Sequence, residues 1–217
     1  AGTIDLNAVV SSTTGAILIT GDVITQDADI TTGGAGTVTL TADTGAITMA
    51  DLTTTTSGTG TIDYSAATDV ALSLLTSTSG DINVTAGSGA SVVGAITDIT
   101  NLEAANLVTT GTVTLTAETG IGSAGAAADI DTTIGTLVAT NNTSGNIVVQ
   151  ETDTLVIGGT GVRTLAGNGN INLDVDAGNL TVDSVVTAHG SGTVTLNADA
   201  GTIDLNAVVS STTGAIL

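Results

Sequence analysis

The chain has 217 residues, of which 29 are glycine and none is proline or cysteine. It contains 21 acidic residues and a single arginine, so that the net charge is −20. This excess of negative charge repels phosphate backbones and anionic lipid surfaces, which excludes nucleic-acid binding. With no phenylalanine or tryptophan, the interior must be filled by Val, Ile, Leu and Ala, which excludes a thick globular core and favours a narrow tube of stacked strands.

Two further classes of protein fit the composition poorly. Disordered segments are poor in aliphatic residues, whereas this chain is 41% hydrophobic with a mean hydropathy of +0.48. No apolar run approaches the ~20 residues that a membrane-spanning helix needs, so we expect no membrane insertion. The absence of cysteine leaves ladder hydrogen bonds and aliphatic stacking as the sources of stability.

A module that opens with glycine recurs along the chain. After the glycine, aliphatic and polar residues alternate, and a second glycine closes the module; this period of two indicates β-strands. Full copies run over residues 36–45, 111–120, 169–178 and 192–201, and shorter openings begin at residues 2, 15, 60, 80 and 145. An internal repeat on this scale is the signature of a solenoid.

The spacing of the modules divides the chain into coils of 20–24 residues, each long enough for three short strands that pair in parallel with the coils above and below. In residues 1–35 we expect Ile4, Leu6, Ile17, Ile19 and Val23 inside, with the polar loop Gln26 to Asp29 outside. In residues 36–79 the expected core is Val38, Leu40, Ala42, Ile47, Met49, Ile62, Tyr64, Val70, Leu72 and Leu74.

The middle of the chain is less regular. Residues 80–110 contain either one coil with an insertion or a coil plus a partial one, and Glu103 to Leu107 could form a helical turn. Residues 120–135 are rich in Gly and Ala and predict a thin coil. Because no Pro-rich or charged linker interrupts the pattern, residues 1–217 are expected to form one elongated domain.

The module and its TTT or SST turns resemble the repeats of filamentous-haemagglutinin-like exoproteins and giant bacterial adhesins. This resemblance implies an all-β fold, a right-handed parallel β-helix. The spacing of the modules gives about nine coils of 20–24 residues in each 199-residue repeat. The resemblance also implies an extracellular or cell-surface location and a role as a stalk or adhesive fibre. No functional residue is carried over, because the matching positions Gly36, Val38, Leu40 and Gly45 are structural in that family as well.

Pairs of acids spaced two residues apart are the candidates for a metal site, because Ca²⁺ prefers clusters of carboxylate oxygens. The calcium candidates are Asp27, Asp29, Asp129, Asp131, Asp174 and Asp176, and Glu151 with Asp153 forms a further pair. The glycine-and-aspartate nonapeptide of calcium-binding β-rolls is absent. We therefore expect no required cofactor, with Ca²⁺ as the alternative.

Catalysis on such a fold needs acids together with a base or metal and basic groups for an anionic substrate. The chain offers only Arg163 and His189, and His189 lies among turn glycines, so we expect no enzyme; a polysaccharide-active enzyme is the rival hypothesis. Binding of a surface glycan, as in an adhesin, is the closer alternative. A minor one is ice binding by threonine series on exposed strands: Thr37, Thr39 and Thr41; Thr112, Thr114 and Thr116; Thr193 and Thr195.

The longest repeat in the sequence consists of two identical stretches, one at each end. Residues 1–18 recur without a change at 200–217, an offset of 199 residues. This identity predicts continuation, with the chain as its own partner, end to end along a fibre. Nine coils at a strand spacing of ~4.8 Å give an advance of roughly 43 Å, and we expect the two copies to be related by a screw about the fibre axis.

Overall fold

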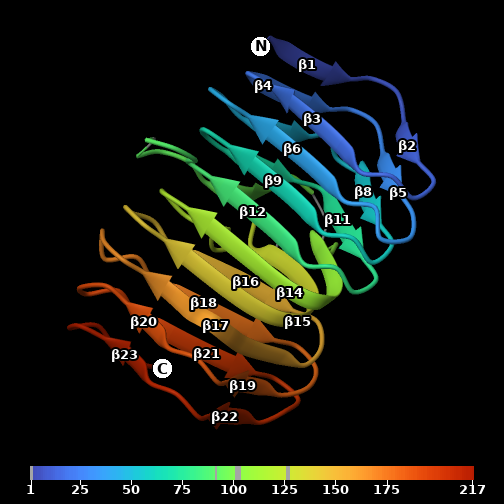
Figure 1. Ribbon diagram of the computed structural model, residues 1–217. Coiled ribbons are helices and arrows are strands. Elements are labelled where there is room, and N and C mark those ends of the chain that lie inside the picture. The colour runs from blue at the N-terminus through green and yellow to red at the C-terminus, as the bar shows by residue number, and fades with distance from the viewer. Residues whose placement is uncertain (1, 91, 101–103, 126–127) are drawn as a thin grey trace.

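The structure is a computed structural model that describes residues 2–90, 92–100, 104–125 and 128–217. These residues contain no helix, and every strand pairing among them is parallel. The strands stack as about nine turns of a β-solenoid, with the two termini at opposite ends of the stack (Figure 1). The predicted all-β parallel solenoid is confirmed. No helix of these residues is long and apolar enough to cross a membrane.

The strands follow one another around the coils in chain order. They are β1 (Thr3–Leu6), β2 (Val10–Ser12), β3 (Ile17–Gly21), β4 (Val23–Gln26), β5 (Ile30–Thr32), β6 (Val38–Ala42), β7 (Ile47–Met49), β8 (Thr54–Ser57), β9 (Ile62–Ala66), β10 (Val70–Leu72), β11 (Leu74–Ser77), β12 (Ile82–Ala86), β13 (Ile96–Asp98), β14 (Leu107–Ala117), β15 (Ile130–Asn141), β16 (Ile147–Glu151), β17 (Leu155–Thr164), β18 (Ile171–Val175), β19 (Leu180–Val182), β20 (Val186–Ala188), β21 (Val194–Ala198), β22 (Ile203–Leu205) and β23 (Val209–Ser211).

Each coil has one long wall and two short ones. Over the first coils the long wall consists of the five-residue strands β3, β6, β9 and β12, continued by the second halves of β14 and β15. We call this the N-terminal long wall. The short walls are the ladder β1–β4–β7–β10–β13 and the ladder β2–β5–β8–β11, which continues into the start of β14.

The long wall changes side within the chain. The five-residue strands β16, β18 and β21, which we call the C-terminal long wall, continue both short ladders at once, through the pairings Ile121↔Ile147 and Thr132↔Glu151. The N-terminal long wall meanwhile divides into the ladder β19–β22 and the ladder β20–β23. The division occurs in β17, where the register shifts around residues 158–161.

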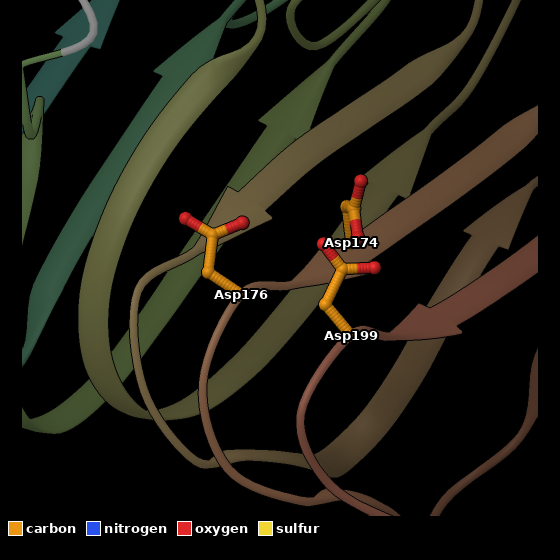
Figure 2. Close-up of side chains that lie close together, drawn as sticks. All are labelled: Asp174, Asp176 and Asp199. Atoms are coloured by element: carbon orange, nitrogen blue, oxygen red, sulfur yellow. The ribbon is translucent and has the colours of Figure 1, made fainter.

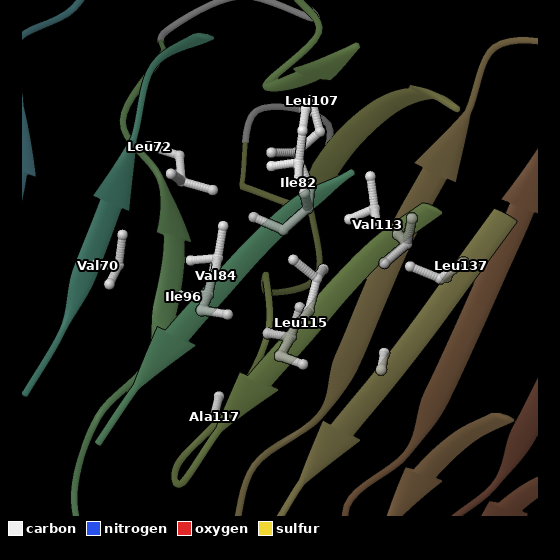
Figure 3. Close-up of a cluster of buried hydrophobic side chains, with 14 of the residues drawn as sticks. Val70, Leu72, Ile82, Val84, Ile96, Leu107, Val113, Leu115, Ala117 and Leu137 are labelled. Carbon is white, nitrogen blue, oxygen red and sulfur yellow. The ribbon is translucent and has the colours of Figure 1, made fainter. Parts of the chain in front are cut away.

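The lumen is filled by rows of aliphatic side chains, one from each coil (Figure 3). Of the residues that the sequence predicts at the centre of the modules, Val38, Leu40, Val113, Leu115 and Val194 are fully buried, and Leu196 is partly buried against the same core. Stacking in rows lets side chains of one size follow one another, so that a narrow tube reaches close packing without large aromatics.

Two expected core positions, Val23 and Leu74, and one expected surface position, Gln26, are wrong. In β4 the even-numbered residues point inward, so Ile24 is fully buried and Val23 is half-buried. In β11 the odd-numbered residues point inward, so Leu75 is fully buried and Leu74 is half-buried. Gln26 was expected outside but points into the lumen, two residues after Ile24. Strand β4 therefore extends to Gln26, although the polarity of Gln26 predicts that this residue lies in the loop.

The module glycines lie at a corner and stack on one another. A Cβ on Gly60 would lie 1.9 Å from the carbonyl oxygen of Gly36, and one on Gly80 would lie 2.1 Å from that of Gly60. Buried hydroxyls close the same corner: Ser77 Oγ accepts from the Gly80 N–H at 2.9 Å and donates to the Gly60 carbonyl at 3.3 Å. The glycine is therefore required by the approach of successive backbones.

The irregular middle consists of coils with excursions. Within residues 80–110, the described part makes one coil, whose wall strands are β12, β13 and the start of β14. The proposed helical turn is not formed in its described part, since Leu107 opens β14; Glu103 lies outside the described residues. Residues 120–135 are not a thin coil, because Ile121 and Ile130 pair with Ile147 and Val149 and the described Gly- and Ala-rich residues between them leave the wall as a loop.

Candidate functional site

The densest group of acids lies where the C-terminal long wall ends. Asp174 on β18, Asp176 just after it and Asp199 just after β21 bring carboxylate oxygens within 4.8 Å of one another (Figure 2). Two of the six calcium candidates are therefore brought together with a third acid. Asp199 could have been found by aligning the modules, because it occupies in 192–201 the place that Asp176 has in 169–178.

Amide side chains hold this acidic cluster together. Asn197 Nδ2 donates to Asp174 Oδ1 at 2.8 Å and to Asp199 Oδ1 at 2.7 Å, and Gln150 Nε2 donates to Asp176 at 3.0 Å. Carboxylates at this distance repel one another unless donors or a cation lie between them. The oxygens are of the type that Ca²⁺ binds. In this structure the amides supply the donors.

The other calcium candidates do not form such a group among the described residues. Asp27 is exposed, and Asp29 accepts the Thr54 N–H at 2.8 Å, so that it caps the strand of the next coil. Asp129 and Asp131 are nearly buried at the start of β15, and the Asp131 backbone exchanges hydrogen bonds with Asn106. Asp29 therefore links neighbouring coils through its carboxylate, and Asp131 does so through its backbone.

Glu151 differs from the other described glutamate, because it points into the lumen. It stands in an interior row between Thr132 and Val175 and is fully buried. Its carboxylate accepts from Thr132 Oγ1 at 2.6 Å and from the Ile134 N–H at 3.2 Å. Burial outweighs these bonds and raises the pKa of Glu151 to about 7. The side chain of its paired acid Asp153 is exposed, while the Asp153 N–H donates to Glu151 Oε1 at 3.3 Å.

A groove of about 460 Å³ runs along the second short ladder, across β8, β11, β14 and β15. Hydroxyl side chains line most of it, with a single carboxylate at one end; among them are Thr56, Ser57, Thr76, Thr109, Thr133 and Asp153. The groove shares no residue with the acidic cluster. Its hydroxyls can both donate and accept hydrogen bonds, as the hydroxyls of a sugar do.

The two basic side chains lie on the ladder of β17 and β20, with Arg163 in β17 and His189 directly after β20. His189 is exposed in a turn, where its N–H donates to Thr164 Oγ1 at 2.9 Å and its carbonyl accepts from Gly192. Arg163 is half-buried on β17, and no hydrogen-bond partner of its buried Nε exists among the described residues. His189 therefore takes the turn position that the sequence predicts.

Threonines stack on the outer face of the N-terminal long wall, but in one column only. Residues paired from coil to coil form this hydroxyl column: Thr20, Thr41, Ser65, Thr85, Thr116 and Thr140. The adjacent column is mixed and contains Leu18, Thr39, Asp63, Asn83, Thr114 and Val138. Thr195 lies on the other long wall. A regular two-column threonine array, as the ice-binding hypothesis requires, is absent from the described part of this wall.

Comparison with protein-family models, with curated proteins and with solved structures gives no significant match for this chain.

Proposed function

We propose that the chain is a structural segment of an extracellular or cell-surface fibre or stalk, built from tandem 199-residue repeats. The observation that carries this proposal is the exact recurrence of residues 1–18 at residues 200–217. Ile203 and Leu205 are 41% and 56% exposed, whereas Leu180 and Val182, which occupy the same ladder one coil earlier, are fully buried. A following coil would cover this row.

The internal duplication supplies the sequence of such a coil. Because residues 200–217 repeat residues 1–18, the residues that would follow in a tandem array are those from Ile19 onward, which already form coils of this solenoid. The resemblance to filamentous-haemagglutinin-like exoproteins supports the same role and location. A net charge of −20 disfavours lateral contact between fibres.

The test compares one repeat with two. A protein made of residues 1–199 followed by residues 1–217 is expected to be a single rod of about twice the length by small-angle X-ray scattering and to melt at a higher temperature. Leu205→Asp at the junction should break the rod or lower its melting temperature. Leu18→Asp in the first repeat, the same exchange at an outward position, should change neither. Two separate short rods would refute the fibre proposal.

The groove favours an adhesin as the second candidate. Its hydroxyl lining suits hydrogen bonding to a glycan, and it crosses four coils of one face. Binding to a glycan array that is lost in Thr76→Val and retained in Thr41→Val, on the other wall, would support this function. Cleavage of any glycan by the purified protein would instead favour the polysaccharide-active enzyme.

A further inference from the structure

Identical sequences occupy different walls of this solenoid. β1 pairs with β4 and belongs to the first short ladder, whereas β22, its copy in the second occurrence of the 18-residue repeat, pairs with β19. The ladder of β22 leads back through β17 and β15 to the N-terminal long wall. The copy has therefore moved to the opposite side of the coil.

Counting along the ladders measures this displacement. Nine steps lead along one interior row: Ile4, Ile24, Ile47, Val70, Ile96, Ile121, Ile147, Ile171, Val194 and Ile216. Eight steps lead along another: Ile17, Val38, Ile62, Ile82, Val113, Leu137, Ile157, Val182 and Leu205.

In sequence, however, Ile216 is the copy of Ile17, and Leu205 is the copy of Leu6. Ile17 lies more than half a coil after Ile4, and Leu6 lies about half a coil before Ile17, so the 199-residue offset spans about eight and a half coils. A whole number of coils would have returned each copy to its own ladder. The half coil is the result of the exchange of the long wall between β15 and β17.

At the junction with a following repeat, a five-residue strand would again pair with a five-residue strand. Ile216 pairs with Val194, the first residue of β21. A strand continuing from Ile216 as β3 continues from Ile17 would have five residues, and it would cover the five residues of β21. No second exchange of walls is needed at the junction, so the exchange occurs once in each repeat.

We infer that successive repeats of this fibre are related by a screw of about half a turn, so that the hydroxyl column faces opposite sides of the fibre in alternate repeats. This inference rests on the proposed tandem fibre. At ~4.8 Å per coil the advance is roughly 41 Å per repeat, and the same face returns after about 82 Å. The partner at each end is the next copy of this sequence, rotated rather than only translated.

The experiment uses a four-repeat protein in which Thr41→Cys is introduced into every repeat, biotinylated and decorated with streptavidin for negative-stain electron microscopy. Streptavidin should lie on alternate sides of a continuous rod, with about 82 Å between labels on one side. Labels on one side only, about 41 Å apart, would overturn the half-turn relation while leaving the fibre intact. A rod that is not continuous would overturn the fibre proposal, and the inference with it.

A control within one repeat separates the exchange of walls from the junction. Thr41 and Thr195 both point outward, the first from the N-terminal and the second from the C-terminal long wall. In a single 217-residue chain carrying both Thr41→Cys and Thr195→Cys, the two labels should lie on opposite sides. Labels on the same side would contradict the exchange itself.

Discussion

The hydroxyl of Tyr64 donates to Oε1 of Gln26 at 2.6 Å inside the lumen, where both side chains are buried. Thr55 completes a closed triangle, because its hydroxyl lies 2.6 Å from the Tyr64 oxygen and accepts from Gln26 Nε2 at 3.0 Å. The three residues come from β9, β4 and β8, so the triangle ties three coils together. Burial raises the pKa of Tyr64 and keeps its hydroxyl neutral.

Removing the Tyr64 hydroxyl should therefore destabilise the solenoid. Tyr64→Phe takes one hydrogen-bond partner from the Gln26 carbonyl and from the Thr55 hydroxyl, which keep only their bonds to each other. This loss inside the lumen costs about 1–3 kcal/mol in the free energy of unfolding, measured by urea denaturation. Adding Gln26→Met and Thr55→Val to Tyr64→Phe removes these polar groups and should recover most of the loss. A triple variant less stable than the single one would contradict the role assigned to the triangle.

The stacked corner glycines make a steric prediction. Gly60→Ala places a Cβ 1.9 Å from the Gly36 carbonyl oxygen, so the two coils must separate at that corner. We expect a loss of about 1–3 kcal/mol, or failure to fold, measured by thermal unfolding. Gly2→Ala is the matched control, since its Cβ would meet no atom within 4 Å. Equal melting temperatures for the two variants would show that the corner is not tightly packed.

Glu151 makes the stability depend on pH. The folded carboxyl holds its proton more tightly than the unfolded one, because its pKa is raised from 4.5 to about 7. Its contribution is therefore greatest below pH 4.5 and is lost as the pH rises through about 7, a change of roughly 3 kcal/mol at most.

Calorimetry between pH 5 and pH 8 tests this linkage. Glu151→Gln keeps the shape without the charge, so it should melt higher than the parent at pH 8 and show a weaker dependence on pH. Asp153→Asn, two residues away on the outside, is the matched control and should keep the dependence on pH. A Glu151→Gln profile parallel to the parent's would show that Glu151 is not the responsible group.

The amide between two carboxylates predicts a dependence on salt. Asn197→Ala removes the donor shared by Asp174 and Asp199, so the melting temperature should fall at low ionic strength and recover in 1 M NaCl. The corresponding loss in the free energy of unfolding is at most about 1 kcal/mol. Asn206→Ala, which loses a bond to Asp183 alone, is the control and should fall less. Calcium chloride should act like sodium chloride at equal ionic strength; a rise specific to calcium and lost in Asp199→Asn would identify a metal site instead.

The alternation of the modules, by itself, determined the strands, the coils and most of the core of this protein. Residues such as Val38 and Leu40 alternate with threonines, and because the pleat of a strand sends successive side chains to opposite faces, the pattern predicts which of them are buried. The glycines that open the modules mark the corner for the same local reason, since only a residue without a Cβ allows the backbones to approach there.

The tertiary structure alone decided where each strand ends and which wall it joins. Gln26 and Glu151 follow the inward alternation of their strands, but their polarity predicts a turn, and only the Tyr64 triangle and the bonds from Thr132 explain how the lumen accepts them. The side on which a module lies is set by the bends between strands and by the pairing with the preceding coil. Because these bends accumulate along the chain, two identical stretches of sequence come to lie on opposite walls.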